Sequence, residues 1–343
     1  MVRLTTPTGA GDIIRAVTSE PWGSQPSSTG AGASPSAALR HVLLWASRRS
    51  QIKRAVTSAP VTRQVVRRFV AGETIEDAVR VTRDLTAGGL QVSLDHLGED
   101  TRDATTARAA VDAYRALAAR LAEDGLATGA EMSVKLSAVG QALDESLALD
   151  NARAICEAAR AAGSLVTIDM EDHTTTDSTL RLVALIRQDF PSTGAVLQAS
   201  LHRTEDDCRA LGVPGSRVRL CKGAYLEPPS VAWQRPDAIR AAYINCLSTL
   251  IAGGALPMAA THDPKLVEAT GRLVRDIGGP GFKHEYQMLF GIRPDEQHRL
   301  VAAGETVRVY VPFGVQWYGY LMRRMAERPA NTALFLRALV SRN

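Results

Sequence analysis

The chain has 343 residues and a formal net charge of +4, with 40 basic and 36 acidic side chains. The charges are interleaved and aromatic residues make up only 5%, which argues against a dedicated nucleic-acid surface. The four cysteines show neither CxxC spacing nor a histidine at zinc-finger distance, and no apolar run approaches the roughly 18 residues of a membrane helix. These features predict a reduced, cytoplasmic protein without structural zinc, a disulfide framework or a membrane span.

The first 69 residues divide into two parts of different composition. Residues 1–38 are rich in Ser, Thr, Gly, Ala and Pro, which predicts a flexible low-complexity tail, because little apolar surface is available to offset the entropy of ordering. Residues 39–69 carry eight basic side chains and no acidic one, interspersed with apolar residues. One interpretation is an amphipathic surface for peripheral contact with an anionic membrane. The other is a solvated helical lead-in to one main domain, which we expect at 39–343.

From residue 75 onward, helical patterns alternate with short apolar segments that end in polar or charged residues. The expected strands are Gln91–His96, Met132–Leu136, Leu165–Met170, Ala195–Ala199, Val218–Lys222, Pro257–Thr261, Lys283–Met288 and Val307–Val311. Helical patterns lie between most of them, for example at Asp150–Ala162, Thr179–Gln188, Ala238–Leu250 and Pro264–Asp276. Eight such units with nearly continuous apolar strands predict an α/β fold, a (β/α)8 barrel rather than an open doubly wound sheet.

In such a barrel the chemistry lies where the strands end at the C-terminal face. The residues at or near the expected strand ends are Asp95, His96, Lys135, Asp169, Glu171, Gln198, Arg219, Lys222, Thr261, His262, Glu285, Gln287 and Tyr310. So many polar side chains on one rim are difficult to explain structurally, because each buried polar group must be paired or costs free energy. With Lys135, Lys222 and Arg219, and with the pair Arg323 and Arg324 further along the chain, we expect a net cationic pocket around Asp169 and Glu285. Such a pocket suits an anionic cofactor together with a carboxylate substrate.

The last expected strand leads into a helix that begins near Val315. On this helix the side chains that share one face are Tyr320, Arg323, Arg324 and Glu327. Two adjacent guanidiniums, with a carboxylate one turn further on, make a fork suited to a small carboxylate ligand. The alternative is a solvated helix with an ion pair between Arg323 and Glu327.

Three classes of function fit these residues. The first is a Schiff-base lyase, in which Lys135 or Lys222 is the nucleophilic amine and Asp169 relays protons. The second is a flavin redox enzyme, in which Arg219 and Lys222 stabilise negative charge on the reduced ring. The third is a barrel used as a ligand-binding module. No metal site is predicted, because the histidines show none of the spacings of known metal motifs.

Ordered segments at the eight expected strand ends carry a resemblance to a known family. They are Leu94–Glu99, Ser133–Ser137, Ile168–Glu171, Leu197–Ala199, Val218–Tyr225, Ala260–Asp263, Glu285–Leu289, and Val309–Gly314 together with Tyr320–Asn331. In this order they closely resemble the FAD-dependent proline dehydrogenases, in the monofunctional bacterial form, over residues 39–343. The resemblance implies a distorted TIM-like barrel that binds FAD without a Rossmann module. It also implies oxidation of L-proline to Δ1-pyrroline-5-carboxylate in proline catabolism, with electrons passed on to a membrane quinone.

The resemblance also implies roles for individual residues. Arg323 and Arg324 would hold the proline carboxylate, with Glu327 orienting them and Lys135 also at the substrate. Asp169 would be the acidic catalytic residue, and Arg219 would lie against the flavin N5 edge. The walls of the proline pocket would be Tyr225, Leu289, Tyr310 and Tyr320, and the ring of Tyr310 would crowd a 4-hydroxyl group and so favour proline over hydroxyproline. The other flavin contacts would be Met170, Gln198, Lys222, Gly223, Ala224, Thr261, His262 and Gln287.

Two positions depart from the family pattern. Ser200 follows Gln198 and Ala199 where many relatives carry an aromatic residue, which reshapes one side of the expected flavin site. Gly319 stands where a proline is common, which loosens the first turn of the last helix. Neither position belongs to the expected carboxylate clamp.

Overall fold

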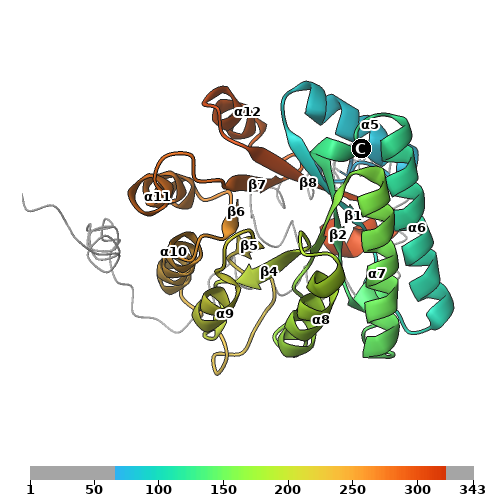
Figure 1. Ribbon diagram of the computed structural model, residues 1–343, viewed down its shortest axis with the longest axis horizontal. Helices are drawn as coiled ribbons and strands as arrows, with labels where there is room; N and C mark the ends of the chain where they lie inside the picture. The colour runs from blue at the N-terminus through green and yellow to red at the C-terminus, as the bar shows by residue number, and fades with distance from the viewer. Residues whose placement is uncertain (1–65, 322–343) are drawn as a thin grey trace, which may run out of the picture.

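The computed structural model describes residues 66–321, in which eight parallel strands form a closed barrel (Figure 1). In chain order the strands are β1 (Gln91–His96), β2 (Ala130–Val134), β3 (Leu165–Ile168), β4 (Gly194–Gln198), β5 (Arg217–Cys221), β6 (Leu256–Ala260), β7 (Glu285–Leu289) and β8 (Val307–Phe313). Each strand pairs in parallel with the next, and β8 closes the barrel on β1. The predicted fold class, an α/β barrel, is confirmed.

Helices surround the barrel (Figure 1). They are α5 (Ile75–Ala87), α6 (Ala104–Glu123), α7 (Glu145–Ala162), α8 (Thr176–Asp189), α9 (Thr204–Leu211), α10 (Pro236–Ala252), α11 (Pro264–Leu273) and α12 (Pro294–Ala302), with short turns η1 (Ala127–Gly129), η2 (Ser137–Val139) and η3 (Val274–Gly278). The side chains of Asp103, Asp144 and Asp263 accept backbone N–H groups at the beginning of α6, α7 and α11. These caps satisfy amide groups that a first helical turn leaves unpaired, so they fix where the loops at the carboxyl rim end.

The expected strands all lie within two residues of the observed ones. The helix expected from Asp150 begins earlier, at Glu145, because Asp144 caps it. Strand β8 continues beyond its expected end to Phe313, because it pairs with β1 as far as His96. The carbonyl of Pro312 also accepts the backbone N–H of Ala71. The helix expected near Val315 begins at residue 317 and is described as far as residue 321.

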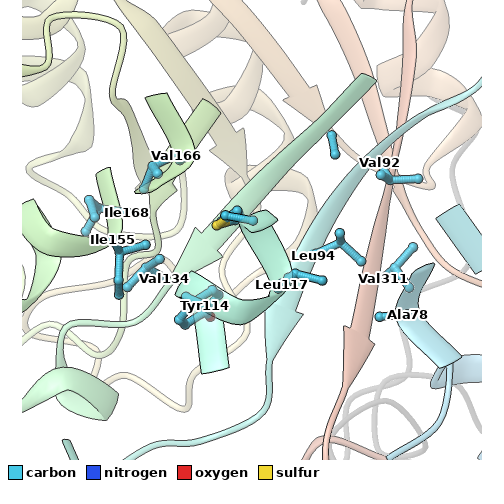
Figure 2. Packing of buried hydrophobic residues seen from close by; sticks show 14 of the residues in the cluster. Ala78, Val92, Leu94, Tyr114, Leu117, Val134, Ile155, Val166, Ile168 and Val311 are labelled. Atoms are coloured by element: carbon cyan, nitrogen blue, oxygen red, sulfur yellow. The ribbon is translucent and has the colours of Figure 1, made fainter. Parts of the chain in front are cut away.

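The apolar core lies between the outer face of the strands and the surrounding helices (Figure 2). On one side Leu94 of β1 packs with Leu117 of α6, and both side chains are fully buried. A second cluster joins Leu220 of β5 to Leu247 of α10. Each such side chain stabilises the fold by roughly 1.5–3 kcal/mol through removal of apolar surface from water. This apolar layer therefore holds the helices against the strands.

The barrel interior is polar, which is unusual for a fold whose interior is commonly filled by branched apolar side chains. Alternation along each strand explains this, because successive side chains point to opposite faces. In β1, Val92 and Leu94 belong to the apolar core, whereas Ser93 and Asp95 are buried among polar partners. In β5, Val218 and Leu220 belong to the apolar core and Arg219 lies inside. The strands therefore separate an apolar outer layer from a charged inner one.

Several expectations concern residues outside the described range. They are the tail at 1–38, residues 39–65 of the basic segment, and Arg323, Arg324 and Glu327 of the expected clamp. Within residues 66–321, none of the helices combines the length and apolarity needed to cross a membrane.

Candidate active site

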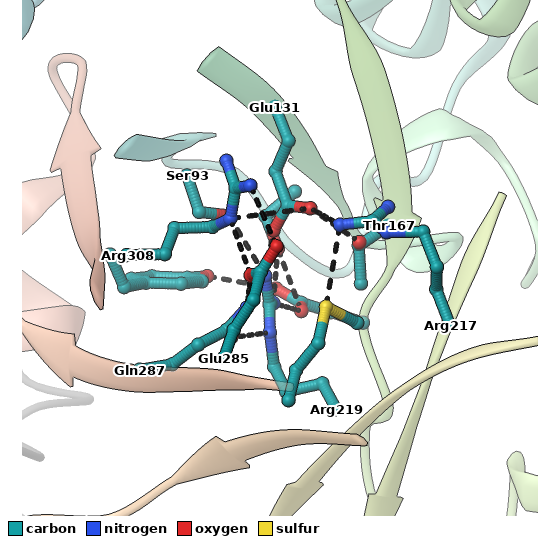
Figure 3. Close-up of polar contacts among 12 residues, drawn as sticks. Ser93, Glu131, Thr167, Arg217, Arg219, Glu285, Gln287 and Arg308 are labelled. Atoms are coloured by element: carbon teal, nitrogen blue, oxygen red, sulfur yellow. Dashed lines mark hydrogen bonds and ion pairs between the residues drawn. The ribbon is translucent and has the colours of Figure 1, made fainter. Parts of the chain in front are cut away.

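The guanidinium of Arg219 lies inside the barrel and is held on every side (Figure 3). Its Nε–H donates to Gln287 at 2.6 Å, and Nη1 donates to Ser133 and Asp169, each at 2.7 Å. Its Nη2 donates to the Ser93 hydroxyl at 2.8 Å and to the carboxylate of Glu131. All five N–H groups of the guanidinium thus have an acceptor, which leaves it little freedom to rotate or shift.

Asp169 follows β3 directly and links Arg219 to Tyr310. One carboxylate oxygen accepts from Arg219 and from Ser133 at 2.8 Å, and the other accepts from the Tyr310 hydroxyl at 2.8 Å. The Arg219 guanidinium carbon also lies 5.4 Å from the centre of the Tyr310 ring. Burial, reinforced by the charges of Asp169 and Asp95, raises the pKa of Tyr310 well above its usual value. The phenol therefore stays protonated and donates to Asp169.

Lys135 follows β2 and completes this cluster. Its ammonium donates to both oxygens of the buried Asp95 carboxylate at 2.8 Å and lies 4.0 Å from Asp169. Burial acts to lower the pKa of Lys135, but the charges of Asp95 and Asp169 outweigh it and raise the pKa. The ammonium is therefore a stable cation, suited to attract an anionic group and poorly suited to act as a nucleophile. The structure thus brings together four of the predicted residues, Asp169, Arg219, Lys135 and Tyr310.

A second layer of charges lies closer to the N-terminal ends of the strands (Figure 3). The carboxylate of Glu131 accepts from Arg217 at 2.5 Å and from Arg219, and lies 3.9 Å from Arg308. Arg308 in turn donates to both oxygens of Glu285, at 2.8 and 3.0 Å. Although burial acts in the opposite direction, these three arginines hold the pKa of Glu131 well below its usual range. Glu131 is thus an ionised group with no exposed surface.

One expectation about this layer is wrong. Glu285 was expected at the C-terminal rim, whereas β7 begins at this residue, so its side chain lies at the opposite end of the strand. The expected net positive charge depends on Arg323 and Arg324, which lie outside residues 66–321, so it stays a prediction. Each cation of the predicted pocket in that range has a carboxylate partner: Asp95 for Lys135, Asp169 and Glu131 for Arg219, and Asp263 for Lys222.

A second group of predicted residues surrounds the ends of β5 and β6. Lys222 donates to the carboxylate of Asp263 at 2.7 Å, and Arg240 donates to the same oxygen at 3.1 Å. Burial raises the pKa of Asp263, but hydrogen bonding to Lys222 and the charges of Lys222 and Arg240 outweigh it, so the pKa is lowered. The hydroxyl of Thr261 accepts the backbone N–H of Asp263 at 3.2 Å. The result is two cations held side by side at the rim.

Gly223 allows two loops at this rim to approach each other closely. Its φ of +111° is unfavourable for any residue with a side chain, and an added Cβ would lie 2.2 Å from the hydroxyl of Ser200. Behind it, Gln198 ends β4 and donates its amide to the carbonyl of Glu171 at 2.7 Å. The glycine is therefore needed because Ser200 packs against this backbone where a side chain would otherwise stand.

His262 is fixed in one tautomer by the chain around it. Its Nε2 accepts the backbone N–H of Leu289 at 2.8 Å, so the ring proton of the neutral form lies on Nδ1. Arg293 donates to the His262 carbonyl at 2.8 Å, and it does so from a left-handed backbone conformation, with a φ of +52°. The β6 and β7 loops are therefore tied together through this histidine.

A cavity of about 950 Å³ opens beside the second group of residues. Its lining includes His202, Trp233, Gln234, Arg235, Arg240 and Ile244. The ring of Trp233 meets His202 edge-on at 4.5 Å and remains 46% exposed. Arg240 connects the cavity to Lys222, because both bind Asp263. The cavity could not be predicted, since nothing in the spacing of residues 226–235 indicates how that loop folds.

The other predicted residues occupy the places expected from their strands. Met170 follows β3, Ala224 and Tyr225 follow Gly223, and Tyr320 is buried in the helix that begins at residue 317. The amide of Gln287 is directed to Arg219 and Glu285. Within residues 66–321, no group of three or more His, Cys, Asp or Glu side chains is arranged to hold a metal ion.

Comparison with known proteins identifies the family. The model of the proline dehydrogenase family matches residues 78–337. The chain belongs to this family. It is 37% identical to proline dehydrogenase 1 of Bacillus subtilis over 89% of the chain and all of that protein, and 37% identical to the proline dehydrogenase of Deinococcus radiodurans over 80% of the chain and 89% of that protein.

A solved structure shows the same fold. Proline utilization A from Bdellovibrio bacteriovorus superposes with a TM-score of 0.74 at 20% identity, over 97% of this chain and 42% of that protein. The predicted family and the predicted class, an oxidoreductase acting on proline in its catabolism, are confirmed by family membership. The lyase alternative is not favoured, in agreement with the stable positive charge of Lys135.

Proposed function

We propose that the chain oxidises L-proline to Δ1-pyrroline-5-carboxylate with FAD as the hydride acceptor, and that a quinone then accepts the electrons. The observation that carries the proposal is the rigid cluster of Asp169, Arg219 and Tyr310 at the mouth of the barrel. A cation held in a water-poor site can stabilise negative charge that develops during a reaction, without any reorganisation at that moment. Membership of the proline dehydrogenase family supports the substrate.

The residues after β5 fit the diphosphate of FAD. Lys222 and Arg240 supply positive charge, and Gly223 lets the backbone of this loop pack closely against Ser200 beside them. Backbone amides together with basic side chains are a common way to bind a dinucleotide phosphate. The Nδ1–H of His262 is a further donor that this tautomer supplies. Gln198, Met170, Ala224 and Thr261 surround the same rim and are proposed to contact the flavin.

The cavity beside Trp233 suits the adenosine end of the cofactor. Its volume lies within the range of about 300–1,000 Å³ that is usual for small-molecule sites. The half-exposed indole offers a flat surface on which a base can stack. Because Arg240 and Asp263 join this cavity to Lys222, one ligand with an anionic centre and an aromatic end can occupy both places.

The substrate would lie between this rim and the last helix. Arg323 and Arg324 are proposed to hold the proline carboxylate as a bidentate clamp, with Glu327 orienting them. The cation of Lys135 supplies further attraction. Tyr310, which is fixed through Asp169, is proposed to form a wall of the pocket together with Tyr225, Leu289 and Tyr320, and to exclude a 4-hydroxyl group.

The chemistry requires that proline lose a hydride and a proton. FAD, when bound, supplies the acceptor for the hydride that leaves the ring carbon next to the nitrogen. The proton leaves the ring nitrogen for solvent, after which the carbon–nitrogen double bond forms. Asp169 and Tyr310 hold their relative positions through one hydrogen bond, and Arg219 is proposed to stand at the reacting edge of the flavin.

The decisive experiment uses the purified full-length chain. We expect a yellow protein with a flavin spectrum whose visible absorbance is bleached by L-proline under anaerobic conditions and restored by a soluble quinone. A preparation that neither takes up FAD nor bleaches with proline would refute the proposed function. Borohydride added together with substrate should trap no adduct on Lys135 or Lys222, and a trapped adduct would support the lyase instead. Co-sedimentation with anionic vesicles tests whether the basic segment 39–69 provides membrane contact.

A variant tests the cofactor subsite separately. Trp233→Ala should weaken FAD binding about 5- to 150-fold, because base stacking on an aromatic ring contributes roughly 1–3 kcal/mol. Leu143→Ala is the matched control, since Leu143 is also a large exposed apolar side chain and lies outside the lining of this cavity. Equal FAD affinities for the two variants would exclude the cavity as the adenosine site.

A further inference from the structure

We infer that Glu131 is a positioning residue for the reaction: it fixes the guanidinium of Arg219 at the place where the flavin ring is proposed to lie. The inference rests on the proposed function for the role of Arg219 itself. Glu131 belongs to β2, at a distance from the C-terminal rim, and no family motif singled it out. Its carboxylate has no exposed surface, so it is not a contact for proline or FAD.

The geometry separates Glu131 from the other acceptors of Arg219. Ser93, Ser133 and Gln287 are neutral, and Asp169 already shares its charge with Tyr310 and Ser133. Glu131 is the anionic partner of Nη2, on the side of the guanidinium away from Asp169. Two carboxylates on opposite sides define both the position and the plane of the arginine fork.

Glu131 is held in place in turn by the layer around it. Thr167 donates to it at 3.0 Å and Arg217 at 2.5 Å, while Arg308 lies 3.9 Å away. A second route runs from Arg308 through Glu285 and the amide of Gln287 to the Nε–H of Arg219. Figure 3 shows the ring of contacts that results. The deep charges are therefore connected to Arg219 directly through Glu131 and indirectly through Gln287.

A structural explanation alone would treat the carboxylates of Glu131 and Glu285 as equivalent. Both are buried, both accept from arginine, and each neutralises positive charge in the same layer. Only Glu131 contacts Arg219 directly, whereas Glu285 reaches it through Gln287. The variants Glu131→Gln and Glu285→Gln each remove one negative charge from this layer, so the difference between them isolates the position of Arg219.

The first measurement needs neither proline nor a reduced flavin. Phenylglyoxal, which reacts with guanidinium groups, is applied to the full-length variants, and modification of Arg219 is followed by peptide mass spectrometry. We expect Arg219 to be protected in the wild type and in Glu285→Gln, and to be modified at least fivefold faster in Glu131→Gln. Equal rates in the two variants would overturn the inference.

The second measurement uses the FAD-loaded enzyme. We expect kcat to be at least tenfold lower in Glu131→Gln than in Glu285→Gln, with the proline KM of the two variants within threefold of each other. The midpoint potential of the flavin should also be lower in Glu131→Gln, because a displaced guanidinium stabilises the negative charge of the reduced ring less well. Glu131→Asp, which keeps the charge, should recover part of both losses. Identical potentials and rates for the two glutamine variants would show that Glu131 is only a structural counter-ion.

Two further outcomes are also decisive. If Glu131→Gln does not fold, Ser93→Ala removes the other acceptor of Nη2 without a change of charge, and it should raise the rate of Arg219 modification in the same direction. No increase in that variant would overturn the inference. If the wild type is not bleached by proline, the proposed function fails, while the modification rates of Arg219 still decide whether Glu131 fixes this side chain.

Discussion

The role of Asp169 can be tested by comparing Asp169→Asn with Asp169→Ala. The carboxylate accepts three hydrogen bonds of 2.7–2.8 Å, from Ser133, Arg219 and Tyr310. Asparagine keeps the shape, because its oxygen can accept from Arg219 and its amide can donate to the phenol oxygen of Tyr310. Alanine instead leaves all three donors without this acceptor, one of them a buried cation.

The expected magnitudes follow from these contacts. Breaking a buried ion pair by removing one partner costs about 3–5 kcal/mol, so Asp169→Ala should lose that amount of unfolding free energy. Asp169→Asn replaces charge-assisted bonds by neutral ones that are roughly half as strong, which costs about 1–2 kcal/mol. The difference of about 2 kcal/mol corresponds to a Tm difference of roughly 4–8 °C for a domain of this size.

Calorimetry and steady-state kinetics on the same preparations provide the test. Both variants should lose at least tenfold in kcat/KM, because both lack one of the two carboxylate charges that hold Arg219. Asp189→Asn is the control, since it removes a carboxylate from an exposed pair with Arg153, where a change below about 1 kcal/mol is expected. Equal melting temperatures for the alanine and asparagine variants, or an asparagine variant as active as the wild type, would refute this account of the site.

Two further predictions concern the rim. Gly223→Ala should lose about 1–3 kcal/mol of unfolding free energy and bind FAD more weakly, because of its φ of +111° and the contact with Ser200. Adding Ser200→Ala should restore part of the stability, measured by urea unfolding, and part of the FAD affinity, measured by titration. A Gly223→Ala variant with unchanged stability and affinity would contradict the close packing of Gly223 against Ser200. Burial raises the pKa of Glu171, so its ionisation destabilises the fold progressively as the pH rises through that raised pKa. Glu171→Gln should therefore be more stable than the wild type at neutral pH, by about 1.4 kcal/mol for each unit by which burial raises the Glu171 pKa. This difference should disappear below about pH 4, where Glu171 is protonated in both the folded and the unfolded state. A difference in Tm between the two proteins that does not change with pH would show that Glu171 does not cause the pH dependence.

The barrel and much of the site could be predicted because parallel strands leave a local signal. Each strand is a short apolar run that ends in polar residues, so Lys135, Asp169 and Arg219 could be brought to one mouth from sequence order alone. Glu131 and Arg308 were missed because they lie within strands, where a charged residue first suggests an exposed face. For Glu131 the sequence does contain a usable pattern. It is two residues before Ser133 and four before Lys135, so the three side chains are expected on the same face of the strand.

The sequence does not show which polar side chains hydrogen bond to one another inside the barrel. Arg219 was expected at the flavin, but its five acceptors come from strands β1, β2 and β7 and from the end of β3, and no local pattern indicates that they meet. The expected position of Glu285 failed for a related reason. Glu285 lay in the first half of the expected strand Lys283–Met288, and β7 in fact begins at this residue, so its side chain lies at the N-terminal end of the strand and not at the rim. Strand ends are the least certain part of such predictions, and polar networks depend on them directly.

The charged interior also shows where the stability of this fold does not come from. Buried ion pairs gain little over apolar side chains of the same size, because desolvation offsets most of their attraction. The apolar layer between strands and helices, with side chains such as Leu94 and Leu220, stabilises the fold directly by removing apolar surface from water. The layer of arginines and carboxylates in the interior is therefore better explained by its positioning of the Arg219 side chain than by a contribution to the stability of the fold. Among the described residues, Arg219 connects that layer to Asp169 and Tyr310. The other charged side chains of the layer, beginning with Glu131, serve the site by restricting the Arg219 guanidinium to one position.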